Sequence, residues 1–155
     1  MSFLFTLDDD VERLKTQLPD IFDAYEHEIE KAAPLFELDG QRLEMIARTV
    51  PKHQAFYADK CQEARQLVKW LENSKAKIEA IHLKNYSRGQ RALSATDQKI
   101  FLAGEPSIIE FNQLIIEATL FYNKFDAIVE AFKQMGFMVG NITRLRVADL
   151  DTIVL

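Results

Sequence analysis

The sequence has little of what builds turn-rich, disulfide-bonded or membrane-spanning proteins. It holds one cysteine, five glycines and four prolines in 155 residues. A single cysteine excludes an intramolecular disulfide framework and a zinc site built on cysteines, and so few turn residues argue against an all-β sandwich or barrel. No apolar run approaches the roughly 18 residues of a membrane helix, and the stretch before Asp8 has no basic residue of the kind that opens a signal peptide. We therefore expect a soluble, cytoplasmic, helical protein.

Catalytic signatures are also scarce. No glycine-rich phosphate loop occurs, and the three histidines lie far apart in the sequence. Glu79-x-x-His82 has the spacing of one half of a di-iron helical site, but the second copy that such a site needs is absent. An exposed ion-pairing face is the better interpretation of these two residues. Cys61 falls on an apolar helical stripe, where a buried, unreactive thiol is expected. We expect no enzyme activity, no metal and no cofactor.

The charge is unevenly distributed along the chain. The net charge is −5 overall, but residues 1–40 carry −8, residues 41–155 carry +3, and residues 65–99 alone carry +5. This pattern divides the chain into an acidic N-terminal helical arm, 1–40, and a helical core, 41–155, whose basic segment is a candidate surface for a polyanion. The alternative is a solvated face on a long helix, which most charge runs are.

Apolar residues recur at helical spacing over most of the chain, which predicts an all-α fold of long amphipathic helices in an elongated bundle. A first stripe runs from about residue 10 to residue 33, with Pro19 expected at the first turn of a second helix. Val50-Pro51 predicts a break. One amphipathic helix is predicted from Pro51 to about Tyr86, with Gly89 as its left-handed terminator.

The second half of the chain is predicted to hold three further helices. Ser94 and Asp97 indicate the start of a short helix that stops at Gly104. Pro106 opens the most apolar segment, which is predicted to end at Gly136.

A last helix is predicted over residues 139–150. Together with the broad apolar surface of the preceding segment, its apolar side predicts self-association. The candidate oligomerisation residues on that side are Ile142, Leu145 and Leu150.

Aromatic residues are interleaved with the basic segment, in Lys69-Trp70 and in Lys84-Asn85-Tyr86-Ser87-Arg88. Binders of single-stranded nucleic acid combine these two features, because every base offers a ring face and every nucleotide a charge. Packing in the helix core is the alternative for both rings, and for Trp70 the two interpretations are evenly balanced. The candidate DNA-binding residues are Lys69, Lys84, Tyr86, Arg88 and Arg91.

A series of short motifs resembles a known family in order and spacing. The motifs are Leu67-x-x-Trp70-Leu71, Tyr86-Ser87-x-Gly89, Leu93-Ser94-Ala95-x-Asp97, Asp126-Ala127-Ile128, Gly136-Phe137, Ile142, and the pair Arg144 and Arg146. Over roughly residues 60–150, the chain resembles the UvsY-type recombination mediators of T-even-like bacteriophages.

The resemblance implies an all-helical protein that assembles into a ring-like homo-oligomer and binds single-stranded DNA. It also implies a role in DNA recombination and repair in the infected host cell. There the family helps load a RecA-like phage recombinase onto DNA covered by single-strand-binding protein. By match of motif, the DNA-facing residues lie around the Tyr86–Gly89 loop, and the C-terminal helix serves self-association. The acidic first 40 residues depart from the family pattern. The alternative is a non-enzymatic helical phage structural or adaptor protein that oligomerises without binding DNA.

Overall fold

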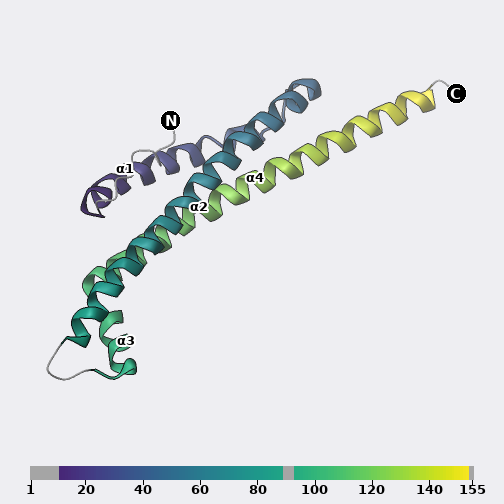
Figure 1. Ribbon diagram of the computed structural model, residues 1–155. Coiled ribbons are helices and arrows are strands. Elements are labelled where there is room, and N and C mark those ends of the chain that lie inside the picture. The colour runs from purple at the N-terminus through teal and green to yellow at the C-terminus, as the bar shows by residue number, and fades with distance from the viewer. Residues whose placement is uncertain (1–10, 89–92, 154–155) are drawn as a thin grey trace. The chain divides into compact units, whose positions relative to one another are not determined.

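The computed structural model describes residues 11–88 and 93–153, and these are helical almost throughout (Figure 1). No strand occurs in this described part of the chain, so the predicted all-α class is confirmed. The elements in chain order are α1 (Val11–Glu30), the short 3-10 helix η2 (Ala33–Phe36), α2 (Leu43–Ser87), α3 (Ala95–Gly104) and α4 (Pro106–Ile153).

Two prolines lie inside helices where the sequence predicted breaks. Pro19 lies within α1 and Pro51 within α2, so both predicted boundaries are wrong. A proline in a helix interior costs about 3 kcal/mol, because it removes one N–H and crowds the preceding turn. Burying one large apolar side chain stabilises by about 1.5–3 kcal/mol. Leu18 and Ile21 are buried beside Pro19, and Val50 is buried beside Pro51. Packing therefore keeps both helices continuous.

Helix α4 continues through Gly136 and Gly140 to Ile153. The predicted end at Gly136 and the separate last helix over residues 139–150 are therefore wrong. A glycine in a helix interior costs only about 0.5–1 kcal/mol relative to alanine. Met135 and Val139 flank Gly136 and are both buried, so their burial outweighs that cost.

Helix α3 begins and ends where the sequence predicts. The Ser94 hydroxyl caps it, because its Oγ accepts a hydrogen bond from the Asp97 N–H at 3.2 Å and donates one to Asp97 Oδ2 at 2.7 Å. The helix ends at Gly104, and Pro106 opens α4 as predicted.

The chain forms two compact units. Unit 1 comprises Met1–Pro19 and Glu63–Leu120, and unit 2 comprises Asp20–Gln62 and Phe121–Leu155. The acidic arm contributes to both, because α1 supplies Leu14 to the core of unit 1 and Tyr25 to the core of unit 2.

The core of unit 1 is mainly aliphatic. Lys15 of α1 reaches α4 in this unit, with its Nζ 2.8 Å from Glu110 Oε2 and 5.6 Å from the centre of the Phe111 ring. The largest buried side chains of the unit are Leu14, Leu18, Leu67, Leu71, Ile108 and Phe111.

The core of unit 2 is mainly aromatic. Tyr57 stacks on Phe132 with ring centres 5.7 Å apart, and Tyr25 meets Phe125 edge-on at 5.3 Å. The Tyr57 hydroxyl donates a hydrogen bond to the Glu28 carbonyl at 3.0 Å. Burial raises the pKa of Tyr57, and the nearby Glu28 charge raises it further. Cys61 is buried in this unit, as predicted.

Candidate nucleic-acid interface

Four cations follow one side of α2 within unit 1. With about 3.6 residues per turn, they fall within an arc of roughly 100° around the helix. Each of them is exposed. The Arg88 N–H donates to the Asn85 carbonyl at 3.2 Å, so this residue continues the last turn just past the end of α2. We call this set the basic face: Lys69, Lys77, Lys84 and Arg88.

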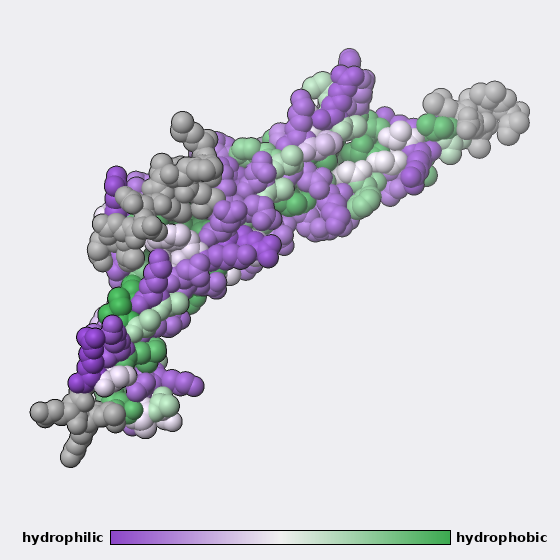
Figure 2. Space-filling view, viewed as in Figure 1, coloured by the Kyte–Doolittle hydropathy of each residue, from purple (hydrophilic) through white to green (hydrophobic). Residues whose placement is uncertain are grey.

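The cations of the basic face form no ion pairs in the described part of the chain, residues 11–88 and 93–153. Glu72 is exposed three residues after Lys69, so it lies beside that end of the basic face, but it forms no ion pair with Lys69. Glu79 lies further around α2 and pairs with Lys75 at 3.5 Å. Hydrophilic side chains gather on the surface over the last turns of α2 (Figure 2). Unpaired cations in a row are what phosphate groups require, because a phosphate then does not compete with a carboxylate.

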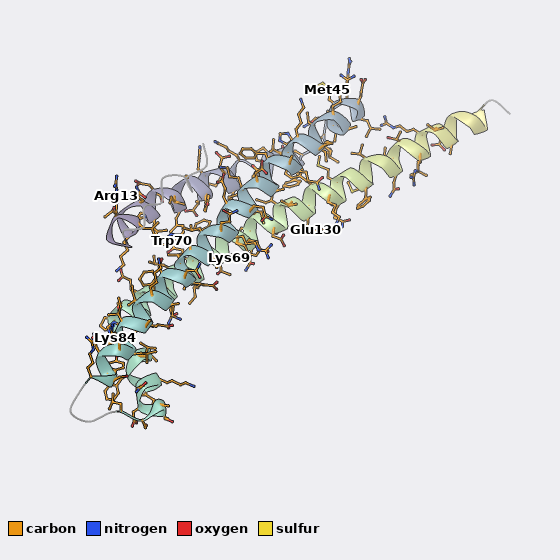
Figure 3. The ribbon with its side chains drawn as sticks, viewed as in Figure 1. Arg13, Met45, Lys69, Trp70, Lys84 and Glu130 are labelled. Atoms are coloured by element: carbon orange, nitrogen blue, oxygen red, sulfur yellow. The ribbon has the colours of Figure 1, made fainter. Side chains whose placement is uncertain are left out.

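Trp70 borders the basic face. Figure 3 labels it on α2 beside Lys69, with Lys84 further along the helix. The Trp70 side chain is partly exposed rather than buried in the core. Helical spacing puts it seven residues, or about two turns, before Lys77 on the same side of α2. Trp70 therefore offers a ring face next to cations, although the sequence left its role open.

Tyr86 lies on the opposite side of α2 from Lys84, because residues two apart in a helix do not share a face. Its hydroxyl donates a hydrogen bond to Glu105 Oε1 at 2.5 Å. Its ring lies 6.3 Å from the Phe101 ring, centre to centre. The contacts of Tyr86 are those of the packing alternative, and its predicted stacking on a base stays a prediction.

Tyr86 is one of four residues that join the end of α2 to the start of α4. His82 Nδ1 lies 3.7 Å from Glu105 Oε1, and His82 Nε2 lies 3.2 Å from Ser107 Oγ. We call these residues, His82, Tyr86, Glu105 and Ser107, the clasp. The hydrogen bond to Glu105 raises the pKa of Tyr86 to about 12, with smaller contributions from burial and from the carboxylate charge. The clasp brings together the two ends of the segment that carries α3.

Of the candidate DNA-binding residues, the structure brings Lys69, Lys84 and Arg88 onto one face and separates Tyr86 from them. Arg91 lies outside the described residues. Lys77 was not among the candidates, although its spacing of eight residues from Lys69 and seven from Lys84 already indicated a shared side.

Glu79 pairs with Lys75, as the prediction of an ion-pairing face expects, and His82 Nδ1 lies 3.7 Å from Glu105 Oε1. Both side chains are half-buried, so the predicted exposure of this face is wrong. Across the described segments, no group of three or more histidine, cysteine, aspartate or glutamate residues is arranged to hold a metal ion. None of the helices described is both long enough and apolar enough to cross a membrane.

The candidate oligomerisation residues lie on α4 in unit 2. Leu145 is 66% exposed and Ile142 is half-buried. Leu150 belongs to α4, but its side chain lies outside the described part of the structure. Phe137 and Met138 add further exposed apolar surface to the same helix.

Comparison with known proteins identifies solved structures with a similar fold. No protein-family profile and no curated protein sequence matches the chain. Two crystal structures of the bacteriophage T4 recombination mediator protein UvsY are similar to it, with TM-scores of 0.66 and 0.68 at 16% sequence identity. Each covers 83% of this chain, and this chain covers 98% and 96% of theirs. The resemblance to UvsY-type mediators predicted from the short motifs is thus confirmed at the level of the fold.

Proposed function

We propose that the protein is a phage recombination mediator that binds single-stranded DNA along the basic face of α2. The observation that carries the proposal is the row of exposed cations without carboxylate partners. Contacts from lysine and arginine to phosphate are independent of base sequence, as a protein that acts along any strand requires. Similarity to the fold of T4 UvsY, which is named a recombination mediator, supports the same role.

Two kinds of contact hold the strand in this proposal. The cations of the basic face neutralise phosphates and release counterions. Trp70 stacks on a base, since an aromatic ring accepts any base. Because one basic face holds only four cations, self-association through the exposed apolar side of α4 raises affinity by presenting several faces to one strand.

In the proposed mediator role, the protein holds DNA without modifying it. The protein keeps a strand accessible while single-strand-binding protein is displaced, and a RecA-like recombinase assembles there in the cytoplasm of the infected cell. This role requires no catalysis by the chain and no cofactor.

A salt titration with matched double variants tests the DNA site. Lys84→Ala with Arg88→Ala removes two unpaired cations, and Lys31→Ala with Lys133→Ala removes two cations that pair with Glu28 and Glu130. Each lost phosphate contact flattens the log–log salt dependence by about 0.7 for a single strand. We expect the first variant to lose a slope of about 1.4 and the second to bind as wild type. Anisotropy of a labelled oligonucleotide at several salt concentrations measures both.

Equal losses in the two variants would show that net charge rather than the basic face determines binding. No binding by the wild type at low salt would favour the alternative, a helical structural or adaptor protein. Sedimentation of the same samples reports the assembly. Recombinase assembly on DNA pre-coated with single-strand-binding protein should be accelerated by wild type and less by the Lys84/Arg88 variant.

A further inference from the structure

Unit 2 contains an open groove between the start of α2 and the C-terminal part of α4. Its volume is about 410 Å³, within the range of roughly 300–1,000 Å³ typical of ligand pockets. Ile46 and Val139 are buried at its base, and the other apolar side chains are half-buried. The apolar lining consists of Leu38, Leu43, Ile46, Val139 and Ile142.

Two guanidinium groups border this apolar lining, one from the residue just before α2 and one from α4. Arg42 and Arg146 are both exposed. Neither has a carboxylate partner anywhere in the described chain. Glu44 also lines the groove, but it pairs with Arg48 at 3.0 Å. An apolar groove with two unpaired cations fits an occupant that carries apolar side chains next to several negative charges.

One segment of this chain has that composition. Residues 3–7 hold four large apolar side chains, and residues 8–10 are the one run of three consecutive carboxylates in the sequence. The apolar part matches the lining, and the carboxylates match the two arginines.

We infer that the groove of unit 2 binds residues 3–10 of a second copy of the chain. A groove on one copy and a segment on the next form a heterologous contact, which generates a ring when the rotation closes. The contact gives the acidic start of the arm an intermolecular role, and it does not depend on DNA binding.

A labelled peptide of residues 1–12 added to the full-length chain tests the groove. We compare Arg42→Glu with Arg146→Glu against Lys52→Glu with Arg144→Glu, which reverses two exposed charges of unit 2 that do not line the groove. The groove variant should bind the peptide at least about tenfold more weakly, because attraction becomes repulsion. The control should stay within about twofold, since it changes only the overall field. Equal losses, or no saturable binding by wild type, would overturn the inference.

A charge swap keeps the test valid if a variant is less stable. A peptide with Asp8, Asp9 and Asp10 changed to Lys should bind the Arg42/Arg146 variant more tightly than it binds wild type. A reversed preference of this kind cannot arise from unfolding. Its absence, in a variant whose circular dichroism matches wild type, would contradict the proposed pairing.

Cross-linking in the full-length chain shows whether the segment in the groove belongs to the same chain or to a second copy. With a photoreactive residue in place of Phe5, we expect cross-links to α2 or α4 near the groove, in a species of two chains. Cross-links within one chain would show that the groove holds its own N-terminal segment and would overturn the intermolecular contact. Sedimentation should show smaller assemblies for the Asp8–Asp10 lysine variant and for the Arg42/Arg146 variant, and larger ones when the two are mixed.

Discussion

The two units use parts of the same helices for different purposes. In unit 2, α2 and α4 bury Tyr57, Phe125 and Phe132 in a core of stacked and edge-on rings. In unit 1, α2 buries leucines, and the basic face on its exposed side carries four cations without carboxylate partners. Aromatic pairs add about 0.5–1.5 kcal/mol beyond their buried area, whereas like charges in a row repel one another. Along α2, therefore, the strongest packing and the candidate binding surface are found in different segments.

The two units also differ in how far their polar contacts are buried. Unit 1 holds its helix ends together through the clasp and through the Lys15–Glu110 ion pair. A partly exposed ion pair such as Lys15–Glu110 contributes about 0–1 kcal/mol. In the core of unit 2, the Tyr57 hydroxyl donates a hydrogen bond to the Glu28 carbonyl among aromatic rings. The buried Cys61 thiol donates to the Tyr122 carbonyl and to Asp126 Oδ1 at 4.0 Å. Unit 1 is thus expected to open more readily than unit 2.

The largest effect is expected from Phe132→Ala in unit 2. The Phe132 ring is fully buried, and its centre lies 4.4 Å from that of Phe36 and 5.7 Å from that of Tyr57. Removing it should lower the free energy of unfolding by about 3–5 kcal/mol. Urea denaturation measures the loss, and hydrogen exchange should locate it in unit 2. The control Met45→Ala, at an exposed position of α2 in unit 2, should change stability by less than about 0.5 kcal/mol.

Trp70→Ala tests the binding surface of unit 1. If the ring stacks on a base, the change should weaken binding of single-stranded DNA by about 1–3 kcal/mol. The salt slope should stay unchanged, because stacking releases no counterions. Trp70→Phe should restore most of the affinity. A lowered melting temperature with unchanged DNA affinity would instead assign Trp70 to the core.

Two glycines of unit 2 have different backbone conformations, so replacing each of them by alanine should affect stability in opposite directions. A Cβ added at Gly140 meets no atom within 4 Å, and the residue has an ordinary helical φ. Gly140→Ala should therefore stabilise the protein by about 0.5–1 kcal/mol. Gly40 has a φ of 75°, which disfavours a side chain, so Gly40→Ala should destabilise by about 1–2 kcal/mol. Thermal melts of the two variants should shift in opposite directions.

The smallest effect at neutral pH is expected from Tyr86→Phe in the clasp. The neutral phenol donates the hydrogen bond, and the pKa of Tyr86 is raised from 10.0 to about 12. Its contribution to stability is therefore fully present below pH 10 and lost as the pH rises through 12. The tyrosinate absorbance of wild type minus that of the variant should titrate near pH 12. A difference titration near pH 10 would show that the clasp is open in solution.

Much of the fold was predictable because it depends on neighbours in sequence. Ser94 and Asp97 are three residues apart, and their hydrogen bonds start α3 wherever the rest of the chain lies. The cations at positions 69, 84 and 88 share a side of α2 through helical spacing alone. Tyr86 could not be placed in the same way, because its partner Glu105 is 19 residues away, between α3 and α4.

The sequence by itself determined the helical class, the amphipathic stripes, the cap of α3 and the row of cations on α2. Each of these arises from residues within a turn or two of one another, where the helical period sets the geometry. Only the tertiary structure decided that α1 and α2 pass through Pro19 and Pro51 and that α4 passes through Gly136. At these positions a local cost of about 0.5–3 kcal/mol is opposed by burial of side chains such as Ile21, Val50 and Val139. The partners that bury them lie far away in sequence, so local preference alone could not show which effect is larger.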